Sequence, residues 1–118
     1  MFEVMKERRR FPRKTLRIPV QYKNLKAAAD VYTGSLSRDL SEGGVRFIGN
    51  EFISLSNRLV LTIMLPAPFR SVKAISKIAW IRRVPMGEQY EIGNQFLNVS
   101  EEDKRLLRNC LDKTTANV

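Results

Sequence analysis

The sequence has 118 residues, of which 43% are hydrophobic and 28% are charged, so it is long enough for one globular domain but not for two. Its net charge of +9 favours an anionic partner, such as a nucleic acid, a nucleotide, a membrane surface or an acidic protein. It has no histidine, one cysteine and no phosphate-binding glycine loop, which excludes disulfides and the usual metal and nucleophilic sites, so we expect a binding protein and not an enzyme.

A basic segment precedes the first predicted strand. Residues 1–17 contain seven Lys or Arg and two acids, and so carry over half of the net charge. A guanidinium offers a planar fork of donors that matches phosphate oxygens and the edge of guanine. Because residues 1–14 show no hydrophobic period, we expect a flexible arm, which is either a solvated basic tail or a segment that an anion holds. The arginines of this run are Arg8, Arg9, Arg10 and Arg13.

Six stretches are predicted strands; most alternate between apolar and polar residues, a period of two that indicates one buried face, whereas the second is rich in Ser and Thr. The first, residues 16–22, includes Pro19, which predicts an irregular start or an edge position because proline has no N–H to donate. The fifth would place Trp80 on the same face as Val72 and Ile78. The stretches cover residues 16–22, 31–40, 45–48, 59–65, 72–84 and 90–96.

The last part of the chain changes to a helical period. Ser100 precedes three acids and resembles an N-cap with first-turn carboxylates, and the apolar residues at 106, 107, 110 and 111 form one stripe. We therefore expect an all-β fold with one terminal helix, in which short antiparallel strands form a small barrel. The expected boundaries are an arm over residues 1–14, a barrel with its helix over 15–113 and a frayed tail over 114–118.

A short polar motif, Asp39-Leu40-Ser41-Glu42-Gly43-Gly44, lies at the end of the second predicted strand. Side chains two residues apart on a strand face one side, so Asp39 and Ser41 should point the same way. A carboxylate there can accept hydrogen bonds from the N1 and N2 groups of guanine, and Gly44 permits a positive φ and lets a flat base approach the backbone closely. The alternative is an ordinary hairpin corner, in which Asp and Ser bond their own backbone.

The basic run and this motif together resemble the PilZ domain family. Arg9 and Arg13 fit its Arg-x-x-x-Arg motif, and Asp39, Ser41 and Gly44 fit its Asp/Asn-x-Ser-x-x-Gly motif. The resemblance covers nearly the whole chain and implies a six-stranded antiparallel barrel with a C-terminal helix that binds the bacterial second messenger cyclic di-GMP. It also implies that the two arginines contact phosphate and a guanine Hoogsteen edge, while the strand motif holds a guanine.

The resemblance suggests four contacts of second rank. Arg8 is basic, which is compatible with two stacked ligand molecules, and Arg10 and Gly43 lie beside the motif residues. Trp80 could offer a ring face near the site, although packing in the core is the favoured interpretation. We expect cyclic di-GMP as the ligand, with no cofactor and no metal.

The expected output is a signal to a separate, unidentified effector protein, since the chain has no room for an attached output domain. No apolar run could span a membrane and residues 1–4 do not begin a signal peptide, so we expect a cytoplasmic location. One alternative is a basic barrel that binds single-stranded nucleic acid, which would need several exposed aromatic side chains. Tyr22, Phe47, Tyr90 and Phe96 fall in phase with core residues, so nucleic acid is the less favoured partner. Another alternative is a PilZ-like adaptor that binds only protein.

Overall fold

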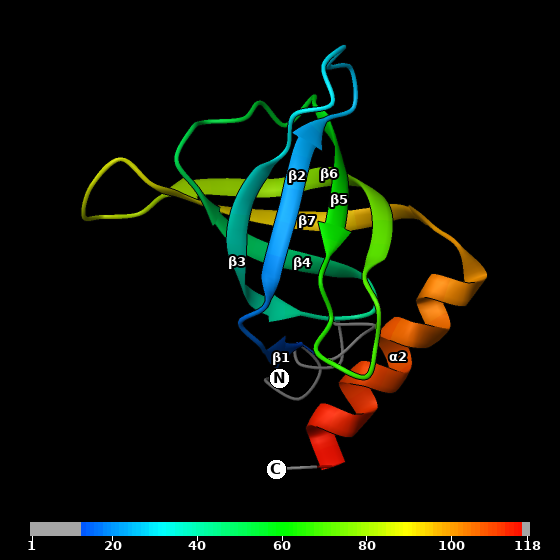
Figure 1. Cartoon of the computed structure of the whole chain (residues 1–118). Coiled ribbons are helices and arrows are strands. Elements are labelled where there is room, and N and C mark those ends of the chain that lie inside the picture. The colour runs from blue at the N-terminus through cyan, green and yellow to red at the C-terminus, as the bar shows by residue number, and fades with distance from the viewer. Residues whose placement is uncertain (1–12, 117–118) are drawn as a thin grey trace, which may run out of the picture.

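The structure is a computed structural model that describes residues 13–116 (Figure 1). Arg8, Arg9 and Arg10, and with them most of the predicted arm, lie outside the described residues, as do residues 117–118. The described part consists of short strands followed by one helix. Its elements are β1 (Lys14–Thr15), β2 (Pro19–Asn24), β3 (Thr33–Leu40), β4 (Gly44–Gly49), β5 (Arg58–Ile63), β6 (Val72–Arg83), β7 (Tyr90–Val99) and α2 (Glu101–Ala116).

The strands form one antiparallel sheet in the order β1-β3-β2-β5-β6-β7-β4. A further pairing of β3 with β4 closes this sheet, so that six strands form a barrel and β1 adds beside the end of β3. The predicted six-stranded antiparallel barrel with a C-terminal helix is therefore confirmed. Closure gives the six long strands neighbours on both sides, which satisfies their backbone groups.

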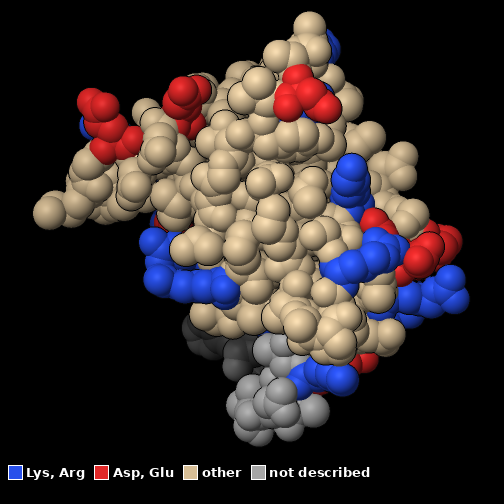
Figure 2. Space-filling view, in the orientation of Figure 1, with Lys and Arg blue, Asp and Glu red and all other residues tan. Residues whose placement is uncertain are grey.

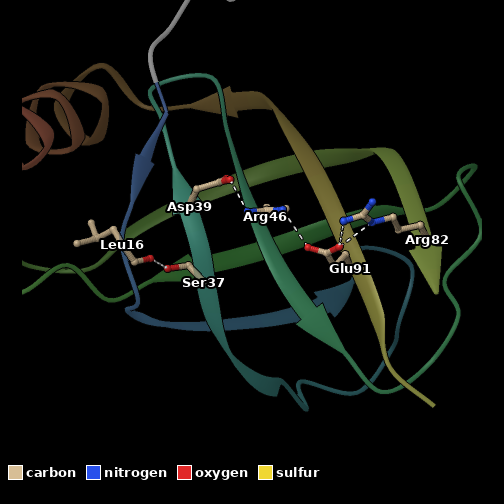
Figure 3. A network of polar contacts seen from close by, with 6 residues as sticks. All are labelled: Leu16, Ser37, Asp39, Arg46, Arg82 and Glu91. Carbon is tan, nitrogen blue, oxygen red and sulfur yellow. Dashed lines mark hydrogen bonds and ion pairs between the residues drawn. The ribbon is translucent and has the colours of Figure 1, made fainter. Parts of the chain in front are cut away.

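The first predicted strand is divided in two. β1 ends at Thr15 and β2 begins at Pro19, as expected for a residue that lacks an N–H. Ser37 stabilises the corner between them, because its Oγ accepts a hydrogen bond from the N–H of Ile18 at 3.0 Å. The same Oγ donates to the carbonyl of Leu16 (Figure 3). Ser37 has no exposed surface, so this corner is fixed from inside the barrel.

The core follows the predicted alternation on most strands. Tyr22 and Phe47 stack with their ring centroids 4.8 Å apart, and burial, followed by the charge of Glu51, raises the pKa of the Tyr22 hydroxyl. At the C-terminus Ser100 caps α2, because its Oγ accepts a hydrogen bond from the N–H of Asp103 at 3.1 Å. The apolar stripe of α2 joins the core through Leu107, Cys110 and Leu111.

Three register shifts change the alternation, and two of them lie beside the predicted site. On β3 the register shifts between Ser37 and Asp39, and on β6 it shifts between Ile78 and Trp80. One extra residue in a strand moves every later side chain to the opposite face. The predicted placement of Trp80 on the core face is therefore wrong: Trp80 is not part of the core cluster and lies opposite Gly93.

The barrel face with β2 and β5 in front is largely uncharged at its centre (Figure 2). In this view Lys and Arg side chains lie toward the edges of the face. The centre of this face therefore offers an anionic ligand little electrostatic attraction, and β4, β6 and β7 lie on the side of the barrel behind it (Figure 1).

Candidate ligand-binding site

A hollow of about 250 Å³ opens on the outer side of the barrel, where β3, β4, β6 and β7 run side by side. It brings together six of the residues predicted for the site. These are Arg13, Asp39, Ser41, Gly43, Gly44 and Trp80. The hollow is also lined by residues that were not predicted, namely Val45, Arg46, Ala79, Gly93, Asn94 and Gln95. Arg8, Arg9 and Arg10 lie outside the described part of the chain, so their contribution stays a prediction.

The floor of the hollow is one lateral row of residues across four strands. Asp39 pairs with Arg46, Arg46 with Gly93, and Gly93 with Trp80. Gly93 has no side chain, so the indole of Trp80 can lie directly over it. A Cβ atom at residue 93 would lie 2.3 Å from ring atoms of Trp80, so the indole covers the glycine closely. The absence of a side chain at residue 93 therefore allows the indole to lie against the sheet as part of the lining of the hollow.

Ser41 organises the turn that forms one wall. Its Oγ accepts hydrogen bonds from the N–H groups of Gly43 at 3.1 Å and Gly44 at 3.2 Å, while its own N–H donates to the carbonyl of Gly44 at 2.9 Å. The hairpin-corner interpretation is thus correct for Ser41. Its hydroxyl holds the two glycines in place, and any contact with a ligand would be additional.

Gly44 serves a purpose different from the one expected. Gly87 is the only residue with a positive φ within 13–116, so the positive φ considered for Gly44 is wrong. A Cβ atom on Gly44 would lie 2.1 Å from the carbonyl oxygen of Asn94. The glycine is needed because β4 and β7 approach closely at this point, not because the turn is left-handed.

Asp39 does not behave as a turn residue. Its Oδ2 lies 3.0 Å from Nη2 of Arg46, and Nη1 of the same guanidinium lies 2.9 Å from Oε2 of Glu91. Glu91 in turn accepts a hydrogen bond from Nε of Arg82 at 2.6 Å. Figure 3 shows this chain of alternating charges, which crosses β3, β4, β7 and β6. The carboxylate predicted to read guanine is therefore held by a network that the motif does not include.

A sequence signal for Arg46 does exist. Folding the motif into a hairpin puts an arginine of the returning strand across from Asp39, and opposite charges on facing strands are a common stabilising pair. The bulge at Arg38 decides whether Asp39 or its neighbour faces that arginine, and this cannot be read from alternation. The role of Gly93 also depends on a bulge, because the indole lies over this glycine only when the β6 bulge turns Trp80 outward.

The start of the described chain lies at the hollow. Arg13 lines it and is exposed, and the following strand pairs Thr15 with Asp39. The predicted arm thus ends beside the strand motif, as the two-motif site requires. Within the strand motif, Glu42 accepts a hydrogen bond from Nε of Arg108 at 2.9 Å, and this carboxylate raises the pKa of Arg108. The motif loop is therefore linked to α2.

A second hollow of about 530 Å³ lies between β7 and α2 and shares Gly43 and Gln95 with the first. No group of His, Cys, Asp and Glu side chains suited to a metal ion occurs in the described part of the chain. Among the same residues, no helix is long and apolar enough to cross a bilayer.

Comparisons with solved structures identify the fold. The Bacillus subtilis inhibitor of motility MotI/DgrA matches with a TM-score of 0.75 and 21% identity over 94% of this chain and 53% of that one. The K. pneumonia MrkH–c-di-GMP complex matches with a TM-score of 0.72 and 19% identity, over 92% of this chain and 53% of that one. The PilZ domain with c-di-GMP of YcgR from Escherichia coli matches with a TM-score of 0.64 and 20% identity, over 86% of each chain. The sequence spans about half the length of the first two proteins.

A search of the curated proteins finds no match to this sequence. The model of the PilZ domain family, in contrast, matches residues 7–113, which include both motifs and all the strands. On this match the chain belongs to the PilZ domain family.

Proposed function

We propose that this chain is a receptor for cyclic di-GMP. The observation that carries the proposal is the convergence of the two motifs, since Arg13 from the first and Asp39, Ser41 and Gly44 from the second line one hollow. Membership of the PilZ family and the presence of c-di-GMP in two of the similar structures support the same ligand.

The chemistry of the ligand suits these residues. Cyclic di-GMP has two phosphates and two guanines, so it needs cationic forks and an acceptor for the Watson–Crick edge of guanine. Arg13, together with Arg9 from the arm, provides the guanidiniums, and Asp39 accepts from the guanine N–H groups. The half-buried indole of Trp80 offers a face on which a base can stack.

Calorimetric titration with cyclic di-GMP and with GTP at matched salt tests the proposal. Losing a buried, charged hydrogen-bonding partner typically costs about 2–5 kcal/mol, so Arg13→Ala and Arg9→Ala should each abolish measurable binding. Arg83→Ala is the matched control, because it removes one exposed cation at the end of β6, outside the hollow. Equal, weak heats for both nucleotides would reject the proposal.

The proposal includes the output. We infer that the ligand orders the arm, residues 1–14, against the barrel and that a separate partner protein reads the change. Two contacts support this route: the pairing of Thr15 with Asp39 next to the arm, and the link from Glu42 to Arg108 of α2. Backbone amide relaxation by NMR tests it. Order parameters of residues 8–14 should rise on binding, and an arm that is equally rigid without ligand would contradict it.

The nucleic-acid alternative receives less support. Tyr22 and Phe47 are buried in the barrel core, so they offer no surface on which bases could stack. The cytoplasmic location and the choice of partner protein stay predictions.

A further inference from the structure

Arg46 occupies a position that neither family motif includes. It lies on the floor of the hollow between Asp39 and Gly93, and its side chain is 29% exposed. Nη2 of its guanidinium contacts Asp39, and Nη1 contacts Glu91. Its Nε is buried and has no hydrogen-bond partner among the residues that the structure describes. Buried donors are normally paired, so the ion pairs that hold this guanidinium are those of its two terminal nitrogens.

The contact leaves Asp39 able to accept further hydrogen bonds. A carboxylate has about four lone-pair sites, and Arg46 Nη2 contacts only Oδ2. A guanine edge would use two of the remaining sites through its N1 and N2 groups. Arg46 and a guanine can therefore bind the same carboxylate at once, so the ion pair does not have to break before the ligand enters.

The pair also limits where the carboxylate can be. Asp39 has a side chain only 13% exposed, and Glu91 only 15%, so neither can turn freely into solvent. Arg82, which is 68% exposed, contacts Glu91 from the outer side and keeps that carboxylate beside Arg46. A guanidinium held at both ends is a rigid support, in contrast to a single surface ion pair.

We propose that Arg46 is a positioning residue for guanine recognition, which holds the Asp39 carboxylate at the angle that accepts a guanine edge. Arg46 acts through Asp39 and not by attracting phosphate. Because Asp39 and Arg46 then form one unit, the effect of removing Arg46 should disappear once Asp39 is gone. This inference rests on the proposed function.

A double-mutant cycle tests the inference. Cyclic di-GMP and cyclic di-AMP are titrated into the wild type, Arg46→Met, Asp39→Ala and the double variant, with thermal unfolding to verify folding. Arg46→Met should weaken cyclic di-GMP about tenfold or more in the wild type, reduce the preference over cyclic di-AMP, and have no further effect in Asp39→Ala. Arg70→Met is the matched control, because Arg70, in the loop between β5 and β6, also contacts two carboxylates, Glu102 and Asp103, but does not line the hollow.

The outcomes separate the inference from the proposed function. A wild type that does not bind cyclic di-GMP overturns both. Wild-type binding, with Arg46→Met equally damaging in both backgrounds, overturns only the inference and assigns Arg46 a direct contact with the ligand. Should Arg46→Met fail to fold, Arg46→Lys replaces it in the cycle: it keeps the charge but loses the fork, and a loss of guanine preference that depends on Asp39 is again required.

Discussion

Trp80 of β6 and Gly93 of β7 face each other in register, and the indole lies where a side chain of residue 93 would stand. The glycine thus determines how closely the ring lies against the sheet, and the bulge between Ile78 and Trp80 determines that the ring is outside at all. Trp80 is the only tryptophan of the chain, so its fluorescence reports on this contact without interference.

Gly93→Ala should displace the indole and weaken cyclic di-GMP. The added Cβ would lie 2.3 Å from ring atoms, and the ring, being a half-buried side chain, is the group that moves. If a base stacks on Trp80, the loss should be about 1–3 kcal/mol of binding free energy. Tryptophan emission and calorimetry measure the two effects. Gly34→Ala is the control, since its Cβ would meet nothing within 4 Å; an unchanged affinity in Gly93→Ala would mean that Trp80 takes no part in binding.

Gly44→Ala should destabilise the fold more than Gly93→Ala does. Its Cβ would lie 2.1 Å from a backbone carbonyl, that of Asn94, which cannot turn away as a side chain can. Overpacking typically costs about 1–3 kcal/mol, and here the β4–β7 pairing must separate as well. Urea unfolding of both variants gives the comparison. A Gly44→Ala variant as stable as Gly34→Ala would show that β4 can shift without cost.

The sequence predicts the barrel better than it predicts the site. Alternation identifies the core because burial depends on one property, hydrophobicity, with a period of two. It fails at Trp80, where a bulge that leaves no mark in the sequence reverses the phase. Asp39 and Ser41 reach the hollow as predicted because they follow the β3 bulge together. Arg46 was missed because the bulge at Arg38 decides which residue of β3 faces it, and alternation does not show that bulge.

Ser37→Ala should destabilise the corner that leads from β1 into β2. The substitution removes the acceptor of the buried N–H of Ile18 and the donor to the carbonyl of Leu16. Leaving such a group unsatisfied costs about 1–3 kcal/mol. Chemical unfolding measures this loss against Ser54→Ala, an exposed serine whose removal should change stability by about 0.5 kcal/mol or less. Equal stability of the two variants would indicate that water replaces Ser37.

Stability should fall at alkaline pH through Tyr22. Burial, and then Glu51, raises the pKa of its hydroxyl above the ordinary value near 10. The folded state therefore holds this proton more tightly than the unfolded state, so the stabilising contribution is complete below about pH 10 and is lost as the pH rises through the folded pKa. Urea unfolding between about pH 8 and pH 11 should show a smaller decline in Tyr22→Phe than in the wild type. Identical declines would assign the effect to other groups.

Asp39→Ala should weaken cyclic di-GMP without improving cyclic di-AMP. Removing a negative charge favours any anion, so simple electrostatics predicts tighter binding of both ligands. Guanine recognition predicts the opposite for cyclic di-GMP, because its N1 and N2 groups lose their acceptor, whereas adenine presents no N1–H to be lost. The matched control is Asp30→Ala, which removes an exposed carboxylate paired with Lys23, outside the hollow. Both variants lose one negative charge, but only Asp39→Ala should change the ratio of the two dissociation constants. If both ligands instead bind Asp39→Ala more tightly, Asp39 serves only to hold Arg46, and guanine must be recognised elsewhere in the hollow.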